Sequence, residues 1–300
     1  MENIERYKHL NKYLKDKFGE RTLKICIDGG FSCPNRINST GCIFCSERGS
    51  GEHLKSTQNI SDQVKNHLNS YKGERANKFI AYFQNFTNTF APIDILKEKY
   101  DSALIDKRIV ALAIATRPDC INEEVCQLLK SYTDKYYVWV ELGLQTSNNT
   151  VGELINRGYS SEQFTEAVTL LNKYNIDVVT HIMVGLPGED FEDLKNTVNF
   201  INSHDIQGLK IHCTYVVENT VLADMLETDK YAPITLDYYL KCVTYVLTHI
   251  NPDIVIHRVS GDAPKDILIA PEWNSHKKWI INGLDKILRE QNLWQGMFYK

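Results

Sequence analysis

Seven short hydrophobic runs, rich in β-branched and aromatic side chains, are spread along the chain, and each has the length of a buried strand. They span residues 23–28, 79–83, 110–115, 137–142, 178–184, 209–214 and 254–258. The stretches between them place apolar residues at helical spacing, as Phe164, Val168 and Leu171 do at i, i+4 and i+7. Strands that alternate with helices predict a parallel sheet with crossover connections.

The predicted helices also carry start signals. Ser160 and Gln163 form the spacing of a capping box. Asn122 precedes two glutamates, and Asp190 opens an acidic first turn. Negative side chains at these positions are stabilised by the positive end of the helix dipole. These signals support helices that begin at residues 123, 161 and 191.

Six or seven strand–helix units are too few for a closed eight-fold barrel. The sequence therefore predicts an α/β fold, a partial (β/α)6 TIM-like barrel at residues 21–250. A helix at residues 3–18 is expected within an N-terminal segment, 1–20. A C-terminal extension, 251–300, is expected to add a strand, a loop and a closing helix near 277–291. No repeat or linker separates these parts, so we predict one domain.

Composition narrows the class of protein. The chain has 300 residues, 43% of them hydrophobic, and a net charge of −4, so no overall basic field indicates nucleic acid. The first residues are charged and lack the apolar centre of a secretory signal. The longest apolar stretch, 109–115, is too short to span a bilayer. Eight cysteines then favour thiol chemistry in a reducing compartment, and we expect a cytoplasmic protein.

The segment CPNRINSTGCIFC directly follows the first predicted strand and holds Cys33, Cys42 and Cys45. Three thiolates on one loop can bind zinc or an iron–sulfur cluster. Structural zinc normally takes four ligands, and only His53 lies near enough in sequence to supply a fourth. Three cysteines suit a four-iron cluster that keeps one iron free for a substrate.

A free iron can chelate the amino and carboxylate groups of S-adenosylmethionine (SAM). An electron from the cluster then breaks a sulfur–carbon bond and releases a 5′-deoxyadenosyl radical, chemistry that belongs to the cofactor. The remaining cysteines are interpreted as core residues, because free cysteine commonly packs as a small hydrophobe. These are Cys26, Cys120, Cys126, Cys213 and Cys242.

Further strings follow successive predicted strands in order: AIATRPDC, VELGLQT, INRGY, MVGLPGE, RVSGDAP and LIAPEW. Together with the cysteine loop, they resemble the radical SAM superfamily, and within it the YhcC/YtqA-like group, over nearly the whole chain. The chain is also similar to the radical SAM domain of the elongator catalytic subunit. The resemblance implies the partial barrel of that superfamily, a 4Fe–4S cluster on Cys33, Cys42 and Cys45, and SAM as the second cofactor.

The resemblance also implies SAM-binding positions. The turn after the second strand, which contains Gln84 and Asn85, corresponds to a glycine-rich turn that contacts the SAM amino group, yet here it lacks glycine. We therefore expect a different local conformation. The other implied SAM-binding residues are Thr116, Gln145, Arg157, His181, Gly185 and Pro187. Among these, the Arg157 fork suits the methionine carboxylate.

The resemblance to elongator suggests that the substrate is the wobble uridine of tRNA, in the pathway to 5-aminomethyl-2-thiouridine, with an external electron donor such as flavodoxin or ferredoxin. Two alternatives stay open. The enzyme could act on a small metabolite or on another protein, or the chain could be an iron–sulfur protein that only transfers electrons. Polar side chains at predicted strand ends are candidates to face the substrate: Glu141, His212, Tyr215, His257 and Arg258. The sequence assigns no catalytic acid–base residue.

Overall fold

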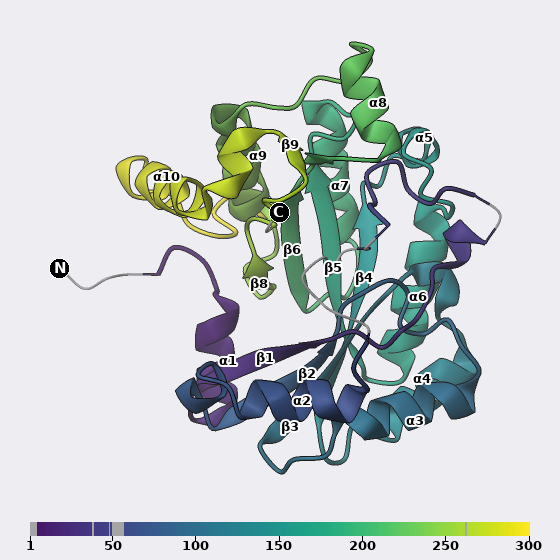
Figure 1. Ribbon diagram of the computed structural model, residues 1–300. Coiled ribbons are helices and arrows are strands. Elements are labelled where there is room, and N and C mark those ends of the chain that lie inside the picture. The colour runs from purple at the N-terminus through teal and green to yellow at the C-terminus, as the bar shows by residue number, and fades with distance from the viewer. Residues whose placement is uncertain (1–4, 38, 48, 50–56, 262) are drawn as a thin grey trace.

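A computed structural model of the chain describes residues 5–37, 39–47, 49, 57–261 and 263–300. It contains a seven-stranded parallel sheet in the order β1-β2-β3-β4-β5-β6-β8 (Figure 1). The strands are β1 (Thr22–Ile27), β2 (Lys78–Phe83), β3 (Ile109–Thr116), β4 (Tyr137–Gln145), β5 (Asp177–Val184), β6 (Gly208–Cys213) and β8 (Val255–Arg258). Every predicted strand is present, with ends that differ from the prediction by three residues or fewer.

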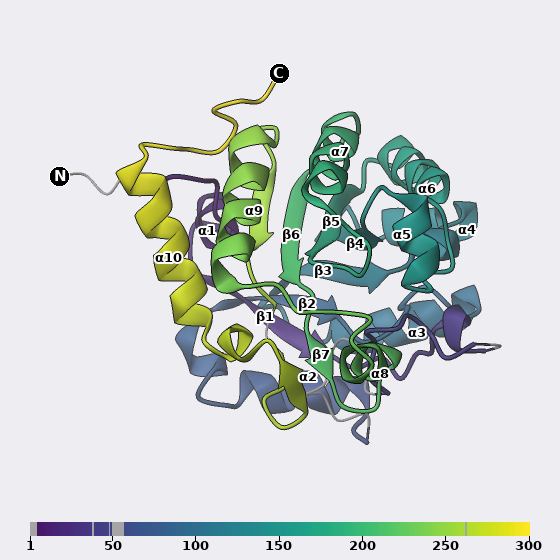
Figure 2. The same cartoon turned by 90° about the horizontal axis from the view of Figure 1, so that it is seen from above.

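Helices cover the outer face of this sheet, which curls into an open half barrel (Figures 1 and 2). They are α2 (Ile60–Leu68), α3 (Ile93–Ala103), α4 (Glu123–Lys130), α6 (Ser161–Lys173), α7 (Phe191–Asn202) and α9 (Leu236–His249). The short helix α5 (Asn149–Leu154) follows β4 and packs in a separate hydrophobic cluster. The predicted caps are confirmed: Asn122 accepts from the Val125 amide, and Ser160 and Asp190 each open a reciprocal capping box. The partial barrel is thus confirmed.

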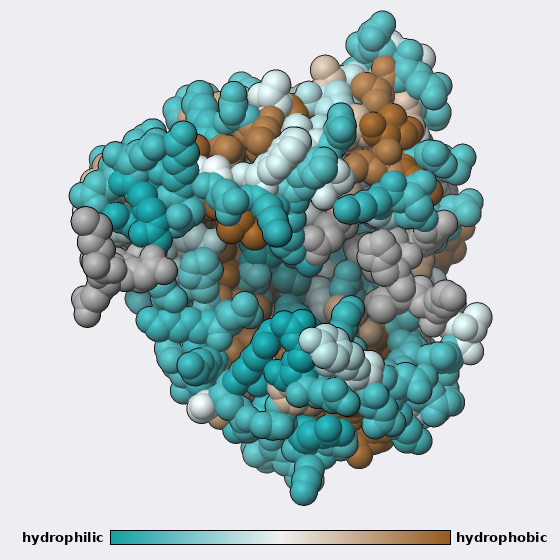
Figure 3. Space-filling model, turned by 60° about the vertical axis from the view of Figure 1, so that its left-hand side comes forward, coloured by the Kyte–Doolittle hydropathy of each residue, from teal (hydrophilic) through white to brown (hydrophobic). Residues whose placement is uncertain are grey.

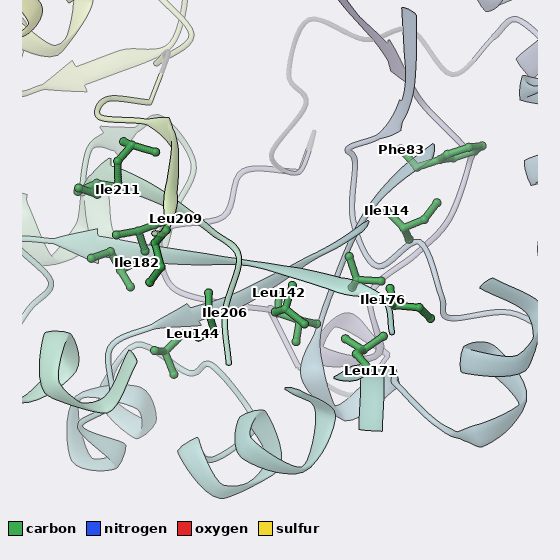
Figure 4. Close-up of a cluster of buried hydrophobic side chains, with 14 of the residues drawn as sticks. Phe83, Ile114, Leu142, Leu144, Leu171, Ile176, Ile182, Ile206, Leu209 and Ile211 are labelled. Atoms are coloured by element: carbon green, nitrogen blue, oxygen red, sulfur yellow. The ribbon is translucent and has the colours of Figure 1, made fainter. Parts of the chain in front are cut away.

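Side chains alternate between the two faces of the strands. On β3, Leu112 and Ile114 point outward into the main hydrophobic core, whereas Ala111, Ala113 and Ala115 belong to a smaller inner cluster. Figure 4 shows part of the outer core, including Ile114 and Leu142 from the sheet and Leu171 from α6. Full burial of each such aliphatic side chain contributes about 1.5–3 kcal/mol, so the outer core holds the barrel together. The inner face carries the smaller apolar cluster together with polar residues.

Helix α1 (Leu10–Phe18) lies in the open side of the barrel, between β1 and β8 (Figure 1). Leu10 and Leu14 are buried in the inner cluster. The helix begins at Leu10 rather than at residue 3, and residues 1–4 lie outside the described part. Just before Leu10 the backbone is extended, because the amide of Ile256 donates to the carbonyl of Lys8.

The C-terminal extension packs back on the barrel. Helix α10 (Lys277–Glu290) lies against α9, as Figure 2 shows. The short strands β7 (Val216–Val217) and β9 (Leu268–Ala270) pair antiparallel, and α8 (Val221–Glu227) follows β7. The division at residues 20 and 250 stays a prediction. No helix in the described part of the chain is long and apolar enough to cross a membrane.

Candidate functional site

The curled sheet encloses a cavity of about 410 Å³ on its concave side. Figure 3 shows a face of the molecule that is hollowed at its centre. The cysteine loop lines the cavity at the carboxyl ends of the strands, and Leu10 and Leu14 of α1 line it from the open side. Strand-end residues of a parallel barrel meet at one edge, which is where active sites of such barrels lie.

The predicted cluster loop brings its three cysteines to this cavity. Cys33, Cys42 and Cys45 all line it, although they span thirteen residues of sequence. Arg36 holds the loop by donating to the carbonyl oxygens of Cys45, at 3.3 Å, and of Ser46. The loop is therefore shaped by a side chain within it, and the thiols are left facing the cavity.

The surroundings of the Cys42 thiol favour its ionised form. Cys45 donates a hydrogen bond that, with nearby Arg117 and Arg36, lowers the pKa of Cys42 to about 7 despite its burial. Asn35 also reaches the Cys42 sulfur at 3.7 Å, and its amide is anchored on the carbonyl of Asn156 at 2.7 Å. Thiolates rather than thiols bind metals, so this environment favours the ligand form of Cys42, whereas the shared hydrogen bond and burial raise the pKa of Cys45.

Four of the predicted SAM-binding residues line the same cavity, and each comes from a different strand or strand end: Gln84, Thr116, Gln145 and His181. The Thr116 hydroxyl lies 2.6 Å from that of Thr89. Oε1 of Gln145 lies 2.7 Å from the Tyr159 hydroxyl, and Gln145 itself has a left-handed φ of 61°. Packing thus fixes side chains of distant strands around one space.

The turn after β2 reaches a glycine-like conformation without glycine. Phe86 has a φ of 56°, in the left-handed region, where most residues are strained. The Arg36 guanidinium lies 5.3 Å from the centre of the Phe86 ring, a contact that helps to hold the turn. The neighbouring Asn85 is buried, and its Oδ1 has no hydrogen-bond partner in the described part of the chain.

Arg157 does not line the cavity. Its guanidinium is buried and donates to the carbonyl oxygens of Leu144 at 2.7 Å, Thr146 at 2.6 Å and Tyr159 at 2.8 Å, and to Asn149 Oδ1 at 3.0 Å. These acceptors occupy the fork that was expected to bind a carboxylate. The residue holds the loop after β4 in place.

Two of the implied SAM-binding residues, Gly185 and Pro187, lie beside a different space. They line a second cavity of about 230 Å³, together with Tyr231 and Tyr238. Gly185 has a left-handed φ of 86°, and a Cβ there would lie 2.9 Å from Ile234. The glycine is therefore required by the turn and by the close approach of Ile234.

Inside the barrel, a buried carboxylate collects polar side chains from most of the strands. We name this group the Glu141 cluster, and its members are Lys24, Tyr82, Trp139, Glu141, His181, Lys210, His212 and His257. Glu141 is fully buried, and its oxygens accept from Lys24 at 3.1 Å, Trp139 Nε1 at 3.1 Å, Tyr82 at 2.7 Å and Lys210. His181 Nε2 lies 3.0 Å from Glu141 Oε2.

The sequence interpretation missed part of this cluster. Lys24 and Lys210 each stand between outward-facing hydrophobic residues in runs that read LKI, and this alternation marks them as inward-facing. Cys26 was expected in the core but lines the cavity, because it lies two residues after Lys24 on the same face. Cys126, Cys213 and Cys242 belong to the outer core as expected, while Cys120 borders a separate surface pocket.

Comparison with known families identifies the chain. Residues 30–201 match the Radical SAM superfamily, and residues 206–290 match the Radical SAM C-terminal domain. The chain belongs to the radical SAM superfamily. Radical SAM proteins bind a 4Fe–4S cluster and SAM, and the chain is a radical SAM enzyme.

Relatives of this radical SAM enzyme include YtqA of Bacillus subtilis, 37% identical over 99% of the chain and 94% of YtqA, and YhcC of Escherichia coli, 32% identical over 93% and 91%. The tRNA uridine(34) acetyltransferase of Methanocaldococcus jannaschii is 31% identical over 55% of the chain, which spans 30% of that protein. The fold resembles Methanocaldococcus infernus Elp3, with a TM-score of 0.70, 20% identity, and coverage of 91% of the chain and 64% of Elp3.

The residues present fit the radical SAM cofactors. Three soft thiolate donors converge on one cavity, and such donors suit iron–sulfur clusters. In the described part of the chain, no three His, Cys, Asp or Glu side chains are placed to hold a single metal ion. His53, the conceivable fourth zinc ligand, lies outside the described residues. Asn85 follows the cavity-lining Gln84, and its buried Oδ1 has no hydrogen-bond partner in the described part of the chain.

Proposed function

We propose that Cys33, Cys42 and Cys45 hold the 4Fe–4S cluster, with SAM beside it in the cavity. The observation that carries this proposal is that the three thiols share one cavity with polar strand-end side chains. The proposed SAM contacts in or beside the cavity are Gln84, Asn85, Thr116, Gln145 and His181. Arg157, Gly185 and Pro187 shape the loops behind the cavity wall.

The bound cluster supplies the electron that reductively cleaves SAM to a 5′-deoxyadenosyl radical. The protein's part is to orient SAM and to exclude water from the radical, which the buried inner wall supports. Arg36 shapes the cysteine loop, and Asn35 holds Cys42 toward the cavity. An external donor such as flavodoxin or ferredoxin delivers the electron.

We propose the wobble uridine of tRNA as substrate, in the pathway to 5-aminomethyl-2-thiouridine. Support comes from the partial similarity to the archaeal tRNA uridine(34) acetyltransferase, which covers 55% of the chain. All eight cysteines are unpaired, which supports a reducing, cytoplasmic location.

The first experiment tests the radical chemistry. The protein is reconstituted anaerobically with iron and sulfide, reduced with dithionite and given SAM. We expect 5′-deoxyadenosine from the wild type and from Cys126→Ala, whose cysteine lies in the outer core, but neither product nor full iron content from Cys42→Ala. Equal iron and product in both variants would refute the cysteine assignment. A well-formed cluster without product, even with bulk tRNA added, would favour an electron carrier.

The second experiment tests the substrate. Loss of the gene should remove the modified wobble nucleoside from digested tRNA, and a gene copy that carries Cys42→Ala should fail to restore it. Purified protein should retain bulk tRNA on filters, with retention that weakens steeply as salt rises. An unchanged nucleoside profile would contradict the tRNA proposal and favour a small metabolite or a protein as substrate.

A further inference from the structure

The Glu141 cluster carries more positive charge than its carboxylate balances. Lys24 and Lys210 both contact Glu141, so two ammonium groups share one carboxylate. Glu141 is the only carboxylate among the cavity-lining residues in the part of the chain that the structure describes. Because excess charge is costly in a low-dielectric interior, such a site gains stability when an anion enters it.

The cluster also has hydrogen-bonding groups without partners. His212 Nε2 and His257 Nδ1 are buried and bond to no described residue. The His257 side chain is 6% exposed, and its Nδ1 lies 4.0 Å from Glu141 Oε1, too far for a hydrogen bond. The Lys210 ammonium bonds to Tyr82 at 2.9 Å and to Glu141, which uses two of its three donors. Several unused polar groups therefore face one enclosed space.

The fold keeps these groups in place and leaves room beside them. The His257 ring fits only because residue 208 is glycine: a Cβ there would lie 2.8 Å from its Nε2. Next to Glu141, the inner wall is lined by Ala115, which has a short side chain. The space is thus built around the imidazole and ammonium groups rather than filled by protein.

The position of the cluster separates it from the cysteines. Tyr82 precedes Gln84 by two residues and Glu141 precedes Gln145 by four, which sets the cluster roughly 6.6–13 Å deeper along the strands. The cysteine loop lies at the strand ends, and the same cavity connects the two regions. If a substrate enters the cavity from the strand ends, the end of the substrate that goes in first would reach the Glu141 cluster.

We propose that the inner end of the cavity is an oxyanion-binding subsite, in which Lys210, positioned by Glu141, and the neighbouring His212 and His257 receive a carboxylate or phosphate group of the substrate. The inference rests on the proposed function only in taking this cavity as the substrate site. Glu141 is a positioning residue, because it orients the ammonium groups of Lys24 and Lys210 and does not itself contact the anion.

Binding should weaken as the pH rises. Burial, with a contribution from Lys24 and Arg258, lowers the pKa of Lys210 to about 7, so its ammonium loses its proton between pH 6 and pH 8. The other titratable groups that face Lys210 keep their charge state between pH 6 and pH 8. Burial lowers the pKa of His181 to about 4 and also lowers those of His212 and His257, and it raises those of Cys26 and Tyr82. The positive side chains around Glu141 keep the pKa of its carboxyl group low.

The test is anaerobic calorimetric titration of the cluster-loaded protein, with saturating SAM, using acetate and inorganic phosphate as probes and acetamide as the neutral analogue of acetate. We expect acetate or phosphate to bind and acetamide not to bind, and the tighter of the two anions identifies the group. Acetate affinity should fall roughly tenfold from pH 6 to pH 8, the change in protonated Lys210 across a pKa near 7. Displacement of the anion by SAM, or equal binding of acetamide, would overturn the proposal.

Variants complete the test. Lys210→Gln and His212→Asn should each weaken anion binding about tenfold, whereas Lys286→Gln, on exposed α10, should not change it. If Lys210→Gln fails to fold, Glu141→Gln/Lys210→Gln removes both charges and should fold without binding the anion. Wild-type affinity in a folded variant that lacks Lys210 would refute the subsite. The titration uses neither tRNA nor SAM cleavage, so its outcome is independent of the tRNA proposal.

Discussion

The role of Arg157 can be decided by one substitution. The guanidinium is buried and donates to three backbone carbonyl groups and one side-chain amide oxygen. Arg157→Met would remove the guanidinium from all four acceptors, of which the Leu144 carbonyl keeps the Thr146 amide and Asn149 Oδ1 keeps the Ser161 amide as donors. A hydrogen bond from a charged donor contributes about 1.5–3 kcal/mol, and each buried acceptor left unpaired costs about 1–3 kcal/mol.

Because the loop after β4 can relax and admit water, the losses do not add fully, and we expect the free energy of unfolding to fall by about 3–5 kcal/mol. Arg157→Lys should restore only part of this loss, because an ammonium cannot span acceptors that the planar fork reaches. Arg289→Met is the control: its partner Asp285 is on the surface of α10, and exposed ion pairs contribute about 0.2–1 kcal/mol.

The assay is urea unfolding of the protein without SAM, followed by circular dichroism, with SAM affinity measured separately by calorimetry. The structure predicts that Arg157→Met loses stability in the absence of SAM. If the variant unfolds at the wild-type urea concentration but binds SAM much more weakly, Arg157 is a carboxylate ligand, as the family resemblance suggested, and the loop-holding role is wrong.

Two further outcomes are expected of the cluster-free protein. Burial lowers the pKa of each inner histidine, to about 4 for His181, whereas a histidine in the unfolded chain titrates near 6.5. The unfolded chain therefore binds more protons below pH 6.5, and the free energy of unfolding should fall as the pH drops below that value. His181→Asn should reduce the slope of the unfolding free energy against pH between pH 6.5 and 4, and an unchanged slope would contradict this. Leu14→Ala should destabilise the protein by about 2–4 kcal/mol, because it opens a hole where α1 closes the barrel, whereas Lys12→Ala on the exposed side of α1 should change the urea midpoint little.

The sequence was sufficient for much of the fold because its signals are local. Strand-length hydrophobic runs and caps at Asn122, Ser160 and Asp190 report on neighbouring residues, and all of them are confirmed. The start of α1 was misplaced by several residues. Its true beginning depends on pairing between Lys8 and Ile256, which lie almost 250 residues apart in the chain.

The candidate site was predicted only in part. Features set by residues close together in the sequence were predicted, whereas contacts between residues far apart in the sequence were not. The cysteine spacing by itself pointed to a cluster loop, and the structure brings those thiols to one cavity. The contacts of Arg157 could not be predicted, because most of its partners are backbone carbonyl groups, which no side-chain pattern marks. The convergence of Lys24, Glu141 and Lys210 depends on strand register and on the curl of the sheet. Sequence determined which side chains face inward; only the tertiary structure decided which of them meet, because contacts between distant strands are set by packing of the whole barrel.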